Sequence, residues 1–243
     1  MRRTIGLLIV LIIPLLAVGQ QTGEELVAAS IKFHDPENNW PKAGVTFNFS
    51  DTRPGKNERE ATLYLDNPSS TLCIMRVHDD GAEVTRHTES DKCSYEVDGN
   101  FEPSAKQIET YSLNEKRSLM LRDYYLYLWG LPMKLTDPGT RIESKIYDKQ
   151  FAGKSTKAAR VTYEAEVGSD IWYFYFDPET NEMIGYQFYH DEAKGDGEYI
   201  VLSEIMEVNN MKIPKNRAWY TNSDSTLLGT DHLINTAALV HTH

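Results

Sequence analysis

Residues 171–190 (IWYFYFDPETNEMIGYQFYH) contain two aromatic runs separated by a short polar segment. Asp177-Pro178 begins that segment and favours a turn, because proline presets the first central φ and the aspartate side chain can bond its own backbone. The residues on either side alternate with period two, which predicts two antiparallel strands. One face of this hairpin would therefore be a wall of rings and aliphatic side chains.

Alternation assigns the side chains of the hairpin to two faces. On the first strand the wall residues are Trp172, Phe174 and Phe176. On the second strand the expected wall residues are Ile184, Tyr186, Phe188 and His190, with Met183 on the opposite face. Such a wall is either a packed core or the lining of an apolar cavity, and the sequence alone does not decide between the two.

The first 19 residues have the pattern of a signal peptide. Arg2 and Arg3 precede an apolar run over residues 5–16 that is too short to span a bilayer comfortably. Ala17 and Gly19 place small residues at the −3 and −1 positions of a cleavage site near Gly19/Gln20. An uncleaved anchor is the alternative. We expect a periplasmic or secreted protein with no stable membrane span after cleavage.

The charge balance restricts the partners of the mature chain. The full chain has 36 acidic and 25 basic residues and a formal charge of −11, which becomes −13 when Arg2 and Arg3 are removed. This excess argues against nucleic acid and anionic lipid headgroups as partners, since both require a basic patch. Residues 20–243 are few enough to form one domain if the fold is mainly β.

The chain has two cysteines, Cys73 and Cys93. They fall in the first and third of three consecutive strand-like runs, at 72–77, 82–87 and 93–97. Strands two spacings apart are separated by about 9–10 Å, which is beyond the reach of a disulfide. Export would permit a disulfide, but we expect free thiols.

Two segments are expected to form helices. Thr22 and Glu25 have capping-box spacing and predict a helix to about Phe33, which His34-Asp35-Pro36 would end. Ser112 and Glu115 repeat the spacing and predict a second helix to about Leu128 with a wide aromatic arc. Such an arc requires an apolar partner, and the ring wall is the natural candidate.

The rest of the chain reads as loops and strands, with residues 98–106 expected as loop. Further strands are expected at residues 43–50, 61–65, 142–148, 158–165, 199–208, 211–220 and 226–234. Asn209-Asn210 fits a two-residue hairpin turn with positive φ. Short connections between sequential strands predict an antiparallel meander, and the chain is therefore expected to be mainly β (α+β).

Several segments resemble known bacterial proteins. Residues 176–181 (FDPETN) and 209–214 (NNMKIP) resemble hairpins of the periplasmic lipoprotein-carrier half-barrel. Residues 23–26 (GEEL), 33–36 (FHDP), 125–132 (YLYLWGLP) and 186–192 (YQFYHDE) are similar to a secreted bacterial family of unknown function, over nearly the whole mature chain. The resemblance implies a curved antiparallel half-barrel sheet with two helices packed in its concave side and an apolar groove between them.

The familiar catalytic motifs HExxH, CxxC, GxSxG and GxGxxG do not occur in the sequence. His34-Asp35, His78-Asp79 and His190-Asp191 are His-Asp pairs, and imidazole and carboxylate groups are zinc ligands or general bases. His190 is expected to face the core or cavity, and His34 could lie in the same groove. A metal or catalytic set of His34, His190 and Asp191 is therefore one possibility. Hydrogen-bonded structural histidines are the other.

The leading hypothesis is a non-catalytic periplasmic or secreted binding protein for a hydrophobic or lipidic ligand, without a cofactor. Its ligand would lie between the sheet and the helix at residues 113–128. The residues expected to bind it are Phe33, Met120, Tyr124, Tyr125, Trp172, Phe174, Phe176, Tyr186, Phe188 and His190. The alternatives are a metal-dependent or general-base hydrolase that uses His34 and His190, and a cell-envelope structural module that binds a protein partner.

Overall fold

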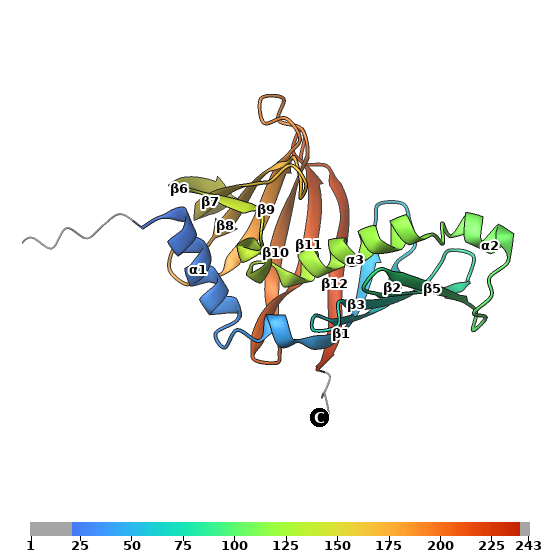
Figure 1. The fold of residues 1–243 in the computed structure, drawn as a ribbon. Coiled ribbons are helices and arrows are strands. Elements are labelled where there is room, and N and C mark those ends of the chain that lie inside the picture. Colours follow the sequence, from blue (N-terminus) through green and yellow to red (C-terminus); the bar gives the residue numbers. More distant parts are fainter. Residues whose placement is uncertain (1–20, 239–243) are drawn as a thin grey trace, which may run out of the picture.

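The computed structural model describes residues 21–238, which form a 12-stranded antiparallel sheet with two substantial helices packed against it (Figure 1). The helices are α1 (Gly23–His34), α2 (Ala105–Thr110) and α3 (Glu115–Gly130), with 3-10 turns η1 (Trp40–Lys42) and η2 (Met133–Thr136). The strands are β1 (Gly44–Thr52), β2 (Arg59–Asp66), β3 (Thr71–Val77), β4 (Glu83–Glu89), β5 (Lys92–Val97), β6 (Thr140–Phe151), β7 (Lys154–Tyr163), β8 (Ile171–Phe176), β9 (Met183–Tyr189), β10 (Glu198–Val208), β11 (Met211–Thr221) and β12 (Leu227–Ala238). The predicted fold class is confirmed.

The predicted signal peptide and its cleavage site lie outside the described residues. Within residues 21–238, no helix has both the length and the apolar character needed to cross a bilayer.

The sheet consists of two meanders joined edge to edge. Its strand order is β5-β4-β3-β2-β1-β12-β11-β10-β9-β8-β7-β6, so β1 pairs with the last strand, β12. Every other neighbouring pair is consecutive in the chain, as the short connections predicted. The β1–β12 pair places the first and last strands of the chain in the middle of the sheet, and the sheet bends around the helices (Figure 1).

The aromatic hairpin forms as β8 and β9, with Trp172 opposite Phe188 and Phe174 opposite Tyr186. A bulge between Tyr175 and Phe176 changes the faces near the turn. Met183 therefore packs into the main core, whereas Ile184 packs with Tyr175 on the other face of the sheet. The assignment of Met183 and Ile184 to faces was wrong, because strict alternation does not account for the extra residue of a bulge.

Both predicted helices are present. Thr22 and Glu25 make the two reciprocal capping bonds of α1, at 2.8 and 3.2 Å. The cap of α3 differs from the prediction, since the Asn114 side chain accepts from the Arg117 N–H at 2.9 Å. Ser112 instead has a positive φ of 52° and ends the turn after α2. The short helix α2 was not expected; it begins at Ala105, within the predicted loop at 98–106, so that prediction was wrong for its last two residues. This helix has no buried residue.

The two cysteines are free thiols, as expected. Cys73 on β3 pairs with His87, and Cys93 on β5 pairs with Thr88, so that β4 separates them. The Asn209-Asn210 turn is also confirmed, with φ values of 51° and 57°.

The main core lies between the sheet and the helices, and Trp129 of α3 is at its centre. The Trp129 ring is fully buried and stacks on Phe47, with 4.5 Å between ring centroids. Gly130, the last residue of α3, lets the chain approach Trp40 closely, because a Cβ there would lie 2.6 Å from that ring. These contacts anchor the C-terminal end of α3 and leave its N-terminal half over the sheet.

Candidate functional site

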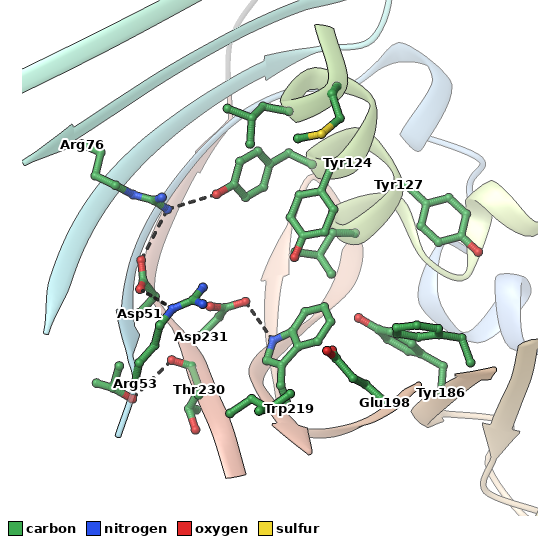
Figure 2. A pocket seen from close by; sticks show the side chains of 18 of the residues that line it. Asp51, Arg53, Arg76, Tyr124, Tyr127, Tyr186, Glu198, Trp219, Thr230 and Asp231 are labelled. Atoms are coloured by element: carbon green, nitrogen blue, oxygen red, sulfur yellow. Dashed lines mark hydrogen bonds and ion pairs between the residues drawn. The ribbon is translucent and has the colours of Figure 1, made fainter. Parts of the chain in front are cut away.

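A cavity of about 650 Å³ lies between α3 and the sheet (Figure 2). One face of α3 forms its roof, because side chains three and four residues apart share a face of a helix. The roof residues are Arg117, Met120, Leu121, Tyr124, Tyr125, Tyr127 and Leu128. The aromatic arc of α3 is therefore divided between a core end at Trp129 and a cavity-lining face.

The opposite wall of the cavity is largely aromatic. Trp172, Tyr186 and Phe188 come from the β8–β9 hairpin, and Trp219 comes from β11. Trp172 and Phe188 pack with ring centroids 4.9 Å apart, so the wall is a continuous surface of rings. Rings of this kind provide apolar area with few rotatable bonds.

Six of the ten predicted ligand-binding residues line this cavity. They are Met120, Tyr124, Tyr125, Trp172, Tyr186 and Phe188. Met120 and Tyr124 are 45% and 43% exposed, although both line the cavity, so this accessible surface includes the cavity wall. Burial raises the pKa of the Tyr124 hydroxyl well above its usual range, so this group is neutral at physiological pH.

The other four predicted residues do not line the cavity. Phe174 and Phe176 are fully buried in the main core. Phe33 packs against Lys212, whose Nζ lies 4.2 Å from the ring centroid. His190 is exposed and its Nδ1 bonds Asp170 at 2.8 Å, so the expectation that it faces the core or cavity was wrong. β9 ends at Tyr189, and the alternation of the strand therefore no longer applies to residue 190.

His34 has a structural environment. Its Nδ1–H donates to the Lys212 carbonyl at 2.6 Å, and its Nε2 accepts from the Met183 N–H at 3.0 Å. Burial lowers its pKa to about 4, so the ring is neutral at physiological pH. With both nitrogens bonded to the backbone, the ring has no lone pair free for a metal. No set of three or more metal-ligating side chains occurs within residues 21–238, so His34, His190 and Asp191 do not form one.

One end of the cavity is polar, and its centre is Asp51. The Asp51 side chain is only 4% exposed and forms ion pairs with Arg59 at 2.5 Å, Arg76 at 3.4 Å and Arg53 at 3.6 Å. Arg76 also donates to the Tyr125 hydroxyl at 3.0 Å. Burial disfavours the charged form of Arg76, but Tyr125 and Asp51 outweigh it and raise its pKa. Arg76 is therefore a fixed cation in the cavity wall.

Asp231 lies beside Asp51 on the inner face of the sheet. The two residues pair across β1 and β12, and cross-strand partners share a face. The Trp219 indole Nε1–H donates to the Asp231 carboxyl at 3.2 Å. The cavity wall contains one further acidic residue, Glu198. Burial raises the pKa of both Asp231 and Glu198.

Behind the wall, Arg217 is fully buried and its guanidinium lies over the Trp129 ring, 3.9 Å from the ring centroid. Its Nη1 donates to the Pro214 carbonyl at 3.1 Å. Arg217 is the cross-strand partner of Asp231 on β11 and β12, so it lies next to the polar end of the cavity.

The sequence prediction did not include these polar residues, although a signal for them existed. Asp51 continues the alternation of Phe47 and Phe49, and Arg76 continues that of Leu72 and Ile74. A charged residue that follows buried residues at period two is expected on the inner face. The predicted strand at residues 43–50 stopped before Asp51, whereas β1 extends to Thr52.

The comparisons with known proteins agree with this architecture. A family model described as "Family of unknown function (DUF6503)" matches residues 5–236. Among proteins with curated descriptions, no sequence matches the chain.

Solved structures with a similar fold include a LolA superfamily protein from Nitrosomonas europaea, with a TM-score of 0.55, 7% identity, and coverage of 91% of this chain and 95% of that one. A domain from Vibrio parahaemolyticus, described as an outer membrane lipoprotein-sorting protein, has a TM-score of 0.50, 9% identity, and coverage of 91% and 95%. A DUF1329 family protein from Desulfovibrio piger has a TM-score of 0.53, 9% identity, and coverage of 92% and 96%. At these identities the similarity establishes a shared fold.

Proposed function

The chain belongs to the DUF6503 family of unknown function, and we propose that it is a non-catalytic binding protein for a hydrophobic or lipidic ligand. The observation that carries the proposal is the cavity under α3, with its aromatic wall and a volume of about 650 Å³. Small-molecule sites have volumes of about 300–1,000 Å³ and are mostly apolar with a few polar groups. This cavity has both properties.

Burial of apolar ligand surface would supply the affinity. An acyl chain that buries about 300 Å² of apolar surface gains about 7 kcal/mol. Part of this free energy offsets the loss of translational and conformational freedom on binding. The Tyr124 hydroxyl, which burial keeps neutral, can orient the ligand without the cost of desolvating a charge.

The shared fold supports the same proposal. One of the similar structures belongs to the LolA superfamily and another is described as a lipoprotein-sorting domain. By analogy, this chain would carry or hold a lipid-like molecule in the periplasm or outside the cell. The signal-peptide pattern of residues 1–19 supports that location.

Uptake of an uncharged fluorophore tests the proposal. We expect N-phenyl-1-naphthylamine, which fluoresces strongly in apolar surroundings, to bind the protein with saturation. Leu121→Trp should weaken binding at least about tenfold, because the larger ring fills the cavity beneath α3.

Lys116→Trp is the matched control, since it adds the same ring at an exposed position on α3 that does not line the cavity. Circular dichroism of both variants would verify their fold. The absence of saturable uptake, or equal uptake by the two folded variants, would contradict the proposal.

A further inference from the structure

We propose that the ligand of this cavity is an amphiphile with an anionic head, a carboxylate or a phosphate, and that Arg76 and Arg117 hold that head at the polar end. This inference rests on the proposed function, because it specifies the chemical class of the molecule that the cavity takes.

The cavity has the two-sided chemistry of an amphiphile site. Figure 2 shows Arg76, Asp51 and Arg53 together at one end, with Tyr127 and Tyr186 at the other. A hydrocarbon tail fits the aromatic end, where the wall provides large apolar side chains. A purely apolar ligand would leave the charged end without a partner, and it would also remove water from these charges.

The charged end has an excess of positive charge. Asp51 is one carboxylate shared by three guanidinium groups, those of Arg53, Arg59 and Arg76. Arg117 adds a fourth from α3, and it forms no ion pair with any residue in the described part of the chain. The Asp51 carboxylate is therefore outnumbered by the guanidinium groups that pair with it.

The other acidic residues of the cavity do not remove this excess. Asp231 and Glu198 also line the wall, but burial raises the pKa of both carboxyl groups and so favours their neutral forms. Even with both ionised, the three carboxylates of the wall are matched by the lining residues Arg53, Arg76 and Arg117. The excess then comes from Arg59, which pairs with Asp51, and from Arg217, which is buried behind the wall. An oxyanion would balance the charge, whereas a cationic head would increase the excess.

Arg76 has hydrogen-bonding capacity to spare. Its Nη2 makes both the bond to Tyr125 and the ion pair with Asp51. Its Nη1 makes no hydrogen bond within residues 21–238, and Arg76 lines the cavity. A guanidinium has five N–H donors in a planar fork that matches the oxygens of a carboxylate or phosphate.

The net charge of the chain does not reveal this site. A mature charge of −13 predicts repulsion of anionic lipid headgroups by the surface as a whole. The alternation of β1, β2 and β3 nevertheless directs Asp51, Arg59 and Arg76 to one end of the inner face. In a cavity with low-dielectric walls these local charges act more strongly than distant surface charges screened by salt.

Displacement of N-phenyl-1-naphthylamine by four twelve-carbon amphiphiles tests the inference. The displacing agents are dodecanoate, dodecyl phosphate and dodecyltrimethylammonium, each below its micelle-forming concentration, and 1-dodecanol below its solubility limit. We expect at least one of the two anions to displace the fluorophore at a concentration about fivefold lower than that of the alcohol or the cation. The more effective anion identifies the head as carboxylate or phosphate.

Arg117→Gln is the informative variant, because Arg117 has no ion pair and its loss leaves no buried charge unpaired. The substitution should raise the half-displacing concentration of the anion about fivefold and leave that of 1-dodecanol unchanged. Lys116→Gln is the control, since it removes the same charge from the adjacent residue, which does not line the cavity.

The outcomes separate the two proposals. Equal displacement by all four amphiphiles, stronger displacement by the cation, or no effect of Arg117→Gln beyond that of Lys116→Gln would overturn the anionic head and leave the hydrophobic site standing. If the fluorophore does not bind at all, the proposed function fails and the inference fails with it.

Discussion

At the scale of single residues, His34 shows how a histidine that resembles a catalytic group can serve the fold. Its two ring nitrogens join the end of α1 to the backbone of β9 and β11, through Met183 and Lys212. Because the ring is buried and neutral, it satisfies two backbone groups that would otherwise lose hydrogen bonds. A structural role for His34, as a hydrogen-bonded core histidine, therefore fits the geometry better than a metal-binding role.

The lowered pKa of His34 predicts a pH dependence of stability. In the folded protein this pKa is about 4, against 6.5 for an ordinary histidine, so between these values the unfolded chain binds a proton that the folded chain does not. The stabilisation is complete above pH 6.5 and is lost as the pH falls toward 4. At about 1.4 kcal/mol per pH unit, the loss approaches 3 kcal/mol.

His34→Gln isolates this effect, because an amide can bond both Lys212 and Met183 without titrating. We expect the stability difference between wild type and variant to change by about 3 kcal/mol between pH 7 and pH 4, with the wild type losing more. Urea unfolding across this pH range measures it. A pH-independent difference would mean that His34 is not neutral and buried in the folded protein.

The alternation of side chains along the strands predicted some positions correctly and others not. It correctly placed Trp172, Tyr186 and Phe188 on the inner face, and the same rule applied to Asp51 and Arg76 would have located the polar end of the cavity. Alternation failed at Met183 and Ile184, because a bulge depends on the pairing of two strands and has no local signal.

At the scale of elements, α3 performs two tasks along its length. Its C-terminal end is fixed in the core by Trp129, which contacts Phe47, Phe49 and Arg217. Its preceding turns present the cavity roof. The sequence predicted the helix and its aromatic arc, but it could not show where core ends and cavity begins, since both require large apolar side chains.

Trp129→Ala should therefore destabilise the whole fold. Loss of this buried ring leaves a large void and exposes the Arg217 guanidinium to it, with an expected cost of about 3–5 kcal/mol. Trp129→Phe should cost less, because a ring still covers Phe47 and Arg217. Urea denaturation curves measure both. A loss below about 1 kcal/mol for Trp129→Ala would show that α3 is anchored elsewhere.

At the scale of the whole molecule, the pairing of β1 with β12 unites two meanders in one sheet. Local patterns predicted that consecutive strands pair in an antiparallel meander. They could not predict this pair, because its residues, such as Phe49 and Leu233, are far apart in sequence. The pair also brings Asp51 next to Asp231 and so completes the cavity wall. The expectation of one domain over residues 20–243 stays a prediction, which this shared sheet supports.

Native mass spectrometry of protein purified from its own host tests most directly whether the cavity under α3 holds an apolar or amphiphilic molecule. We expect a discrete added mass that organic extraction releases as a lipid-like molecule, and that Leu121→Trp lacks. A bare polypeptide mass for the wild-type protein, together with no saturable uptake of N-phenyl-1-naphthylamine, would contradict the proposed function and favour a cavity with no ligand.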